Sequence, residues 1–471
     1  MQRLISITKS VALAALLSLA MAASTANAQA PAASGDSARL YAEKYADASK
    51  KLNAKQRQLM DNLDQKMSAE FMSRAGSPRE PLIAGNDSTG QAGSPRLRVS
   101  LLTCGPGNEV YEYYGHSAIR VMQADSMGLD VTFNYGVFDF NTSNFALKFA
   151  MGKTYYMCVG QPTEDFLASY QRSGRYVDEQ VLNLTQAECQ RIYLALLDNA
   201  KPEKRTYLYN FLYDNCATRI RDIIERNIDG RLQYPARPTE RSFRDAIHFF
   251  CHNAKWSVFG QDLLLGSKAD LPATGRELQF APLILAQDLD HTIILGGGFS
   301  VHNFVLEKHR LVDPEPAEFH PGFPLTPAAL ATVLLVAAVA LGAWEIRRRR
   351  IVWAVDSVLM LVQGIAGAIV TFVYFFSIHP TVDSNWLIWI LNPLPLVGLY
   401  WQIKGARRGD YKQYHIIAAP VLALFLLCSR GMPQYFGAAT ILLASLMLVR
   451  SATSLVVWAK LRRAAKTKQK L

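Results

Sequence analysis

The amino-acid sequence predicts an α+β domain outside the cytoplasm, followed by an all-α bundle of about five transmembrane helices. The chain begins with the pattern of a secretory signal, its middle mixes strand-like and helix-like segments, and its last third alternates apolar stretches with basic clusters. The expected units are 1–28 (signal peptide), 29–95 (polar helical arm and linker), 96–312 (exported domain), 313–324 (proline-rich neck), 325–459 (transmembrane bundle) and 460–471 (basic cytoplasmic tail).

The first 28 residues contain the three parts of a secretory signal peptide. Arg3 and Lys9 precede an apolar run from Val11 to Ala23. Small residues in Ala26-Asn27-Ala28 then form a cleavage site before Gln29. The apolar run is short for a membrane span, so we expect the segment to be removed after export. An uncleaved anchor is the alternative.

Five apolar stretches in the C-terminal third predict membrane helices. They are Leu325–Trp344, Trp353–Ile378, Trp386–Trp401, Ile416–Cys428 and Phe436–Trp458. A span needs about 20 residues, a length that the third and fourth stretches do not reach. Basic clusters follow the first, third and fifth stretches, at Arg347–Arg350, Lys404–Lys412 and Lys460–Lys470. Alternating spans put all three clusters on one side, which the positive-inside rule identifies as the cytoplasm. The signal peptide independently puts the large domain on the opposite side.

These clusters also explain the high charge of the chain. The formal net charge is +11, and the three clusters hold fourteen basic residues and one acid, Asp410. The remainder of the chain is therefore slightly acidic. The charge indicates membrane topology, so we expect no nucleic-acid partner.

The exported domain is predicted to combine strands and helices. The expected strands are Leu97–Thr103, Ser117–Met122, Val131–Tyr135, Thr154–Gly160 and Asp178–Leu184. The expected helices are Asn144–Met151, Phe166–Ser173, Thr185–Asn199, Ala217–Arg226, Ser242–Cys251 and Gln261–Leu265. Five cysteines lie in this domain, in a compartment that permits disulfides, so at least one thiol stays unpaired in a monomer. Cys104 with Cys158 or Cys251 is a candidate disulfide.

Two segments contain the residue types of a thiol nucleophile site. Tyr113-Tyr114-Gly115-His116-Ser117 opens a strand, and Asn215-Cys216 opens a helix. A helix N-terminus and a neighbouring imidazole both lower the pKa of a thiol, and the imidazole later protonates the leaving group. We therefore expect Cys216 to be the nucleophile and His116 to be its base.

Three further residues would complete this site. Asn134, on the strand after His116, is the first candidate to orient the imidazole, and Asp139 is the second. Asn215 and the backbone N–H of Cys216 are candidates to bind an oxyanion, and Tyr113 is a candidate positioning residue. Each signal also has a purely structural interpretation: a structural histidine, a disulfide-bonded cysteine or an asparagine that only caps a helix.

Weaker candidates lie elsewhere in the chain. Asp262 and Asp270 in "QDLLLGSKAD" would either line a substrate groove or cap a helix. His379 and Asn385 fall between the second and third spans, on the outer side, where ionisable residues suggest contact with a lipid head group, with an ordinary loop as the alternative.

A metal site is a further possibility to weigh. His248, Cys251 and His252 have H-x-x-C-H spacing on an expected helix. A structural zinc site uses four ligands, and the sequence offers no evident fourth one. We therefore expect neither a metal nor another cofactor.

Several ordered motifs resemble known families. "GHSAIRV" opening a strand before "YDNCATRIRD" opening a helix resembles circularly permuted papain-like (NlpC/P60-type) thiol enzymes. From about Arg96 to Val456, the segments "SLLTCGPGNEVYEYYGHSAIRV", "FNYGVFDF", "YLYNFLYDNCATRIRD", "FGQDLLLG" and "HPTVDSNWLIWILNPLPL" are similar to the Lnb-type family of bacterial envelope proteins. That family pairs an exported Cys–His domain with a membrane bundle, and the arm at 29–95 is a departure from it.

The resemblance implies a lipoprotein N-acyltransferase of the bacterial inner membrane, with its catalytic domain in the periplasm. A fatty acyl chain would pass from a phospholipid to the N-terminal amine of a diacylglyceryl-cysteine lipoprotein. Cys216 would carry the acyl group, and His116 would act as base and then as acid. Two alternatives remain open: a membrane-tethered peptidase or amidase acting on cell-wall peptide, and an envelope scaffold without catalytic activity.

Overall fold

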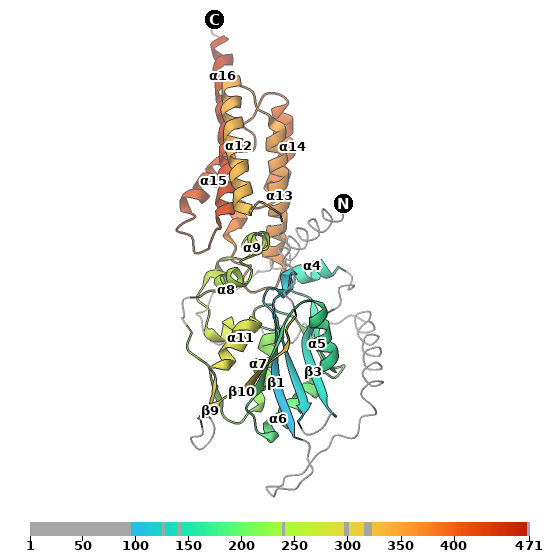
Figure 1. Ribbon diagram of the computed structural model, residues 1–471. Helices are drawn as coiled ribbons and strands as arrows, with labels where there is room; N and C mark the ends of the chain where they lie inside the picture. Colours follow the sequence, from blue (N-terminus) through green and yellow to red (C-terminus); the bar gives the residue numbers. More distant parts are fainter. Residues whose placement is uncertain are drawn as a thin grey trace.

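The computed structural model describes residues 96–124, 128–138, 144–237, 241–295, 301–314 and 323–468. The expected signal peptide, the arm and Asp139 lie outside the described residues. Figure 1 shows an elongated molecule, with a sheet-containing domain at one end and a bundle of long helices at the other.

A seven-stranded antiparallel sheet forms the centre of the domain, in the order β10-β5-β1-β2-β3-β4-β6. Its strands are β1 (Leu97–Cys104), β2 (His116–Gln123), β3 (Asp130–Val137), β4 (Tyr155–Pro162), β5 (Val177–Leu182), β6 (Thr206–Leu208) and β10 (Val305–Val312). A small second sheet has the order β7-β8-β9, with β7 (Arg231–Gln233), β8 (Ile293–Leu295) and β9 (Val301–Asn303).

Helices cover both faces of the large sheet, which is why six successive residues of β1 are buried. The helical elements are η1 (Val110–Glu112), α4 (Phe145–Ala150), α5 (Thr163–Arg172), α6 (Gln186–Asn199), α7 (Cys216–Asn227), α8 (Phe243–Phe250), α9 (Lys255–Asp262), η2 (Ser267–Asp270), α10 (Gly275–Leu278) and α11 (Pro282–Asp290). Helices α6, α7 and α11 pack on one face through Ile192, Ile220 and Leu285, and α5 packs on the other through Phe166. The expected α+β class is confirmed.

Two segments illustrate where this domain differs from the expectation. The helix expected at Gln261–Leu265 is wrong: α9 ends at Asp262, and the leucines after it are buried in a turn. Their apolar character reflects burial and not helical periodicity. Strand β10 was not expected, because most of its side chains are exposed and its sequence therefore lacks a buried face. Its backbone pairing with β5 keeps it in the sheet.

The bundle contains α12 (Pro327–Arg348), α13 (Trp353–Phe376), η3 (Trp386–Trp389), α14 (Leu394–Ala406), α15 (His415–Cys428) and α16 (Ala438–Lys468). Four segments of the described chain are long and apolar enough to cross a membrane: Pro327–Arg348, Trp353–Phe376, Trp386–Ala406 and Ala438–Thr467. The expected fourth span corresponds to α15, whose 14 residues rise only about 20 Å, less than a typical hydrocarbon core. The expected five spans are thus four long apolar segments and one short helix.

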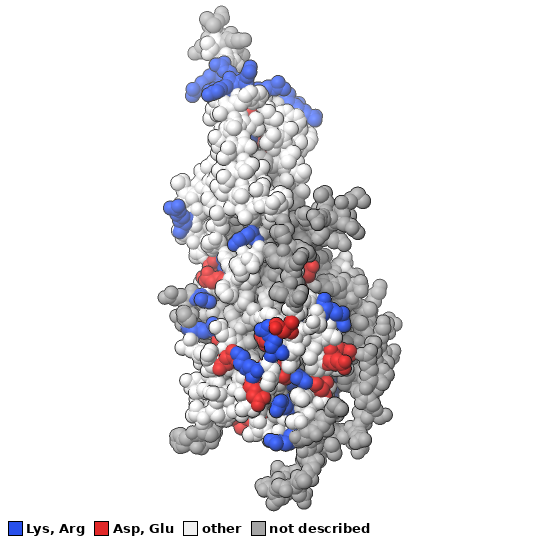
Figure 2. Space-filling model, viewed as in Figure 1, with Lys and Arg blue, Asp and Glu red and all other residues white. Residues whose placement is uncertain are grey.

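Charge is distributed unevenly over the molecule. Figure 2 shows Lys and Arg gathered at the end of the bundle far from the domain, then a nearly uncharged band, then mixed charges over the domain. Inside the bundle, Arg450 of α16 binds Glu345 of α12 through Nη1 (2.5 Å) and Asp356 of α13 through Nε (2.7 Å). Since an unpaired charge is expensive in an apolar interior, these contacts hold the three helices in one arrangement.

Candidate active site

The start of α7 positions Cys216. Asn215 is the N-cap: its side-chain oxygen accepts from the backbone N–H of Thr218 (3.0 Å), and the Thr218 hydroxyl accepts from the backbone N–H of Asn215 (2.8 Å). This reciprocal capping box makes Cys216 the first residue of the helix, at the positive end of the helix dipole. The local sequence therefore places the thiol where a negative charge is favoured.

The side-chain amide of Asn215 is fully engaged. Its two N–H groups donate to the carbonyls of Phe211 and Phe280, each at 2.8 Å. These bonds tie the start of α7 to the segment that precedes α11. Its amide hydrogens are directed at protein carbonyls and not toward a site for an oxyanion, so Asn215 positions the start of α7.

His116 lies at the first position of β2, opposite Cys104 of β1. Its Nε2 is 2.7 Å from Oδ1 of Asn134, which lies on the neighbouring strand β3 opposite Ala118. Because an amide oxygen only accepts, Nε2 donates this hydrogen bond. Nδ1 is left for the hydrogen bond with Cys216. The structure thus brings together Cys216, His116 and Asn134 in one chain of contacts.

The two central groups shift each other's pKa. Burial disfavours the thiolate of Cys216, but the charge of His116 and its hydrogen bond outweigh burial and lower the pKa of the thiol. Burial likewise disfavours the imidazolium, but the negative charge of Cys216 and the hydrogen bonds to Cys216 and Asn134 raise the pKa of His116. Both pKa shifts therefore favour the charged forms, the thiolate and the imidazolium.

The thiol of Cys104 provides a comparison for that of Cys216 within the same domain. Cys104 lies across the strand pair from His116, but burial raises the pKa of its thiol to about 12. All six cysteines fall within the described residues, and none forms a disulfide, so the candidate pairing of Cys104 with Cys158 or Cys251 is absent. Among the five thiols of the domain, Cys216 alone has a lowered pKa and lies at a helix start.

The Cys–His pair lies at the end of the domain that faces the bundle. Tyr114, two residues before His116, packs in one apolar cluster with Leu212, four residues before Cys216. The same cluster contains Val370 and Val373 of α13. Tyr113 packs against this cluster and hydrogen-bonds Ser257 of α9. The expected positioning residue therefore lies between the Cys–His pair and the bundle.

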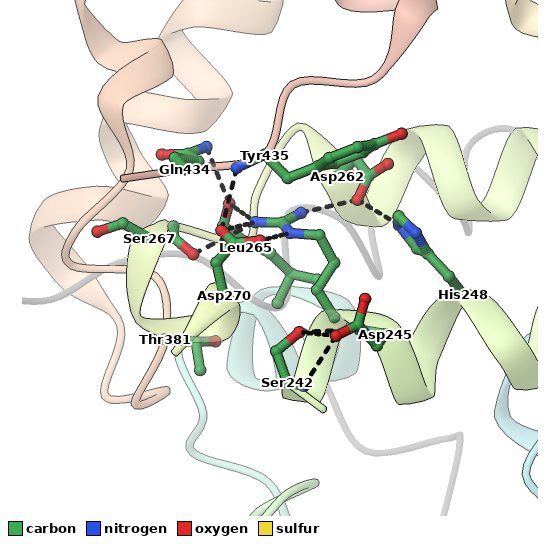
Figure 3. A network of polar contacts seen from close by, with 12 residues as sticks. Ser242, Asp245, His248, Asp262, Leu265, Ser267, Asp270, Thr381, Gln434 and Tyr435 are labelled. Carbon is green, nitrogen blue, oxygen red and sulfur yellow. Dashed lines mark hydrogen bonds and ion pairs between the residues drawn. The ribbon is translucent and has the colours of Figure 1, made fainter. Parts of the chain in front are cut away.

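Asp262 and Asp270 belong to a separate network, which Figure 3 shows with both carboxylates pointing toward a common centre. That centre is Arg244 of α8, whose Nη1 binds Asp262 (2.7 Å) and whose Nε binds Asp270 (2.6 Å). Asp262 also contacts Nε2 of His248 (2.8 Å). We call Arg244, His248, Asp262 and Asp270 the Arg244 cluster. Its carboxylates are directed at this arginine and not into a groove.

The Arg244 cluster also fastens the domain to the bundle. The backbone N–H of Tyr435, between α15 and α16, donates to Asp270 (3.3 Å), and the side chain of Gln434 donates to the carbonyl of Leu265 (3.1 Å). Leu265 also accepts a bond from Arg244 (2.9 Å). The network therefore joins residues about 170 positions apart.

His379 and Asn385 make further contacts between the two parts. Nε2 of His379 lies 3.1 Å from the carbonyl oxygen of Phe149 in α4, and the Asn385 amide donates to the carbonyl of Leu263 (2.9 Å). Both side chains are buried. The structure therefore places both side chains at the contact between domain and bundle.

The three residues with metal-ligand spacing diverge. His248 contacts Asp262, Cys251 donates to the hydroxyl of Tyr114 (3.3 Å), and Nδ1 of His252 lies 2.8 Å from the carbonyl oxygen of Phe249. Within the described residues, no group of three or more His, Cys, Asp or Glu side chains is arranged to hold a metal ion.

Comparison with known families matches both parts of the molecule. Residues 86–245 match the Lnb N-terminal periplasmic domain, and residues 318–462 match the Lnb transmembrane domain. The chain belongs to the Lnb family. Lnb domains indicate membrane-bound lipoprotein N-acyltransferases, so the chain is an inner-membrane enzyme with a periplasmic domain. No curated protein and no solved structure matches the chain.

Sequence reasoning missed two residues that organise this Lnb chain. Thr218 completes the capping box. It could have been found from the sequence, because a capping box pairs the N-cap residue with the residue three positions later. Arg244 left no such signal, because a single arginine in a short helix is ordinarily a solvated residue. Only the packing of α8 against η2 shows that Arg244 is buried.

Proposed function

We propose that this protein is a thiol-dependent lipoprotein N-acyltransferase, in which Cys216 takes an acyl chain from a phospholipid and passes it to the N-terminal amine of a diacylglyceryl-cysteine lipoprotein. The observation that carries the proposal is the Cys216–His116 pair, stabilised as thiolate and imidazolium at the bundle-facing end of an Lnb domain. The strand with His116 precedes the helix with Cys216, an order that supports a circularly permuted papain-like fold.

The first step forms a thioester. The Cys216 thiolate attacks the carbonyl carbon of a phospholipid ester, and the carbonyl oxygen becomes an oxyanion. The first backbone N–H groups of α7 have no carbonyl partner within the helix and favour this negative charge. When the carbon–oxygen bond breaks, the His116 imidazolium gives its proton to the leaving glycerol oxygen. The products are an acyl thioester on Cys216, neutral His116 and a lysophospholipid.

The second step transfers the acyl group. The free N-terminal amine of the lipoprotein attacks the thioester carbonyl, and the carbon–sulfur bond breaks to return the thiolate. Neutral His116 takes the proton that the amine loses, so the imidazolium is restored. Asn134 acts throughout as a positioning residue, because its bond to Nε2 holds the other ring nitrogen toward Cys216.

The membrane setting favours this reaction over peptide hydrolysis. Phospholipids and lipoproteins both lie in the outer leaflet of the inner membrane, next to which the Lnb domain is tethered. The gathering of basic residues at the far end of the bundle supports an orientation with that end in the cytoplasm. A peptidase acting on soluble cell-wall fragments gains nothing from an active site directly above the bilayer.

The test is mass spectrometry of a lipoprotein N-terminal peptide from cells in which this protein is the only N-acyltransferase. We expect a third acyl chain with wild-type protein and none with Cys216→Ala, while Cys104→Ala retains it. If wild-type protein adds no acyl chain, the lipoprotein assignment is wrong. If Cys216→Ala still adds the chain, the thiol mechanism is wrong.

A further inference from the structure

A column of stacked aromatic rings leads away from the Cys–His pair. Neighbouring ring centroids lie 4.1 to 6.0 Å apart, and neighbouring ring planes are within 13 to 25° of parallel. In order, the rings belong to Tyr209, Tyr156, Phe138, Phe145 and Phe149. We call these five residues the aromatic column. Offset stacking of this kind is favourable, and here it produces a continuous row of aromatic rings.

The column begins beside the catalytic imidazole. Gly136 of β3 has φ of +95°, and a Cβ added there would lie 3.7 Å from Cε1 of His116 and 3.9 Å from Cδ2 of Tyr156. These are ordinary contact distances, so the His116 and Tyr156 rings flank the position where the glycine lacks a side chain. The imidazole and the first part of the column therefore lie close to the same glycine.

The column ends at the bundle. The ring of Phe149 lies 6.2 Å from the ring of His379, whose Nε2 is also 3.1 Å from the Phe149 carbonyl oxygen. The backbone N–H of Ile378 donates to the carbonyl of Met151 (3.2 Å). Figure 1 shows α4, which contributes Phe145 and Phe149, directly beside the domain-facing end of α13. The aromatic column therefore extends from the catalytic pair to the membrane boundary.

The column is not sealed inside the core. Tyr156 is buried, but Tyr209, Phe138, Phe145 and Phe149 are only half-buried. Beside them, Tyr111 is 48% exposed with its ring edge-on to Phe138. A contiguous apolar surface of this kind is uncommon on a soluble face and marks a site for an apolar partner. A peptide chain would bring polar backbone groups that rings cannot satisfy.

We propose that the aromatic column binds the fatty acyl chain of the donor and holds it from the membrane boundary to the thioester at Cys216. This inference rests on the proposed function, in which the transferred acyl chain is the long apolar group attached to the carbonyl carbon that Cys216 attacks. Each methylene removed from water contributes to binding, so the rings nearest the membrane contact only long chains. Phe145 and Phe149 then determine the preference for chain length.

The test compares thioester formation on Cys216 from palmitoyl and hexanoyl phosphatidylglycerol, with full-length protein in proteoliposomes. We expect Phe145→Ala and Phe149→Ala to lower the palmitoyl rate about ten-fold and to leave the hexanoyl rate within about two-fold of wild type. Phe249→Ala is the matched control: Phe249 lies on α8, is 65% exposed and is outside the column. Equal losses with both donors, or no loss with either, would overturn the assignment.

A second measurement separates this inference from the proposed function. Cys216→Ala protein, which cannot react, is irradiated in vesicles of phosphatidylglycerol with a diazirine at the end of its acyl chain. We expect adducts on peptides that contain Phe138, Phe145 or Phe149. Adducts confined to the outer surface of the bundle overturn the column as an acyl site. If wild-type protein forms no thioester but the column is labelled, the transferase proposal fails and the acyl site stands.

Discussion

The Cys–His pair and the Arg244 cluster are two buried polar sites at the same end of the domain, and they use their charges differently. In the Arg244 cluster, the guanidinium is bound by two carboxylates and a backbone carbonyl, and Asp270 is also bound by the bundle. At Cys216, one imidazole balances a half-buried thiolate, and both pKa values are shifted toward the charged forms. A fully paired buried charge is costly to unpair, whereas a charge that is held but still accessible is available for reaction.

The largest expected effect comes from His116→Ala. Without the imidazole, the Cys216 thiol regains a higher pKa and the leaving group has no acid, so thioester formation should fall roughly 10³-fold. The thermal unfolding midpoint should hardly change. Single-turnover mass spectrometry measures the rate, with His309→Ala on the exposed face of β10 as the control. A His116→Ala protein that unfolds, or that reacts at the wild-type rate, would remove the distinction between the two sites.

Arg244→Leu should act on stability. It leaves the buried carboxylate of Asp262 and the half-buried carboxylate of Asp270 without the guanidinium, which costs about 3 to 5 kcal/mol of unfolding free energy. Chemical denaturation in detergent measures the loss. Arg276→Leu removes a guanidinium that is half exposed and should cost less than about 1 kcal/mol. Similar losses for the two variants would show that the Arg244 cluster has no special part in joining domain and bundle.

Asn134→Ala should weaken catalysis less than the loss of His116. The imidazole remains but is no longer held in place, so we expect thioester formation to slow by about ten- to a hundred-fold. The bond to Asn134 raises the pKa of His116, so its removal lowers that pKa. The imidazolium is then lost at a lower pH, and the alkaline limb of the pH–rate profile should move to lower pH. An unchanged profile would mean that Asn134 is only structural.

Alkylation with iodoacetamide should distinguish the thiol of Cys216, at the start of α7, from that of Cys104, at the end of β1. The lowered pKa of Cys216 keeps it a thiolate below the pH at which ordinary thiols ionise, so it should be labelled near neutral pH. Cys104, with a pKa of about 12, should stay unlabelled until the solution is strongly alkaline. Peptide mapping at several pH values measures both. Equal labelling of the two thiols would contradict the ion pair at Cys216.

The smallest effect is expected at the helix caps. Ser242→Ala removes the N-cap of α8 and should cost about 1 kcal/mol of unfolding free energy. Asn215→Ala removes the N-cap of α7 and two further bonds to backbone carbonyls, so it should cost more. Denaturation curves of the two variants provide the comparison. A larger loss for Ser242→Ala would reverse the view that Asn215 is the more extensively bound cap.

Much of the domain could be predicted from local pattern. Strand β5 and helix α6 match the expected segments within about two residues, because their apolar residues follow a clear period and Thr185 supplies a recognisable cap. The helix expected at Gln261–Leu265 was misplaced, because Leu264 and Leu265 are buried in a turn and their apolar character does not indicate a helix. β10 escaped prediction because an exposed edge strand shows no alternation.

The reactive residues were identifiable from the sequence for a local reason: the helix start at Cys216 and the strand start at His116 are marked by the residues next to them, and family motifs surround both. Their distance in the chain carries no information on whether they meet, so the hydrogen bond between them and the contact with Asn134 came only from the packing of α7 against β2 and β3. The contacts of Asp262, Asp270, His379 and Asn385 likewise came only from the packing. Local sequence specifies which groups are polar, but their partners come from segments far away in the chain. Tertiary packing alone therefore directed those four residues to the contact between domain and bundle.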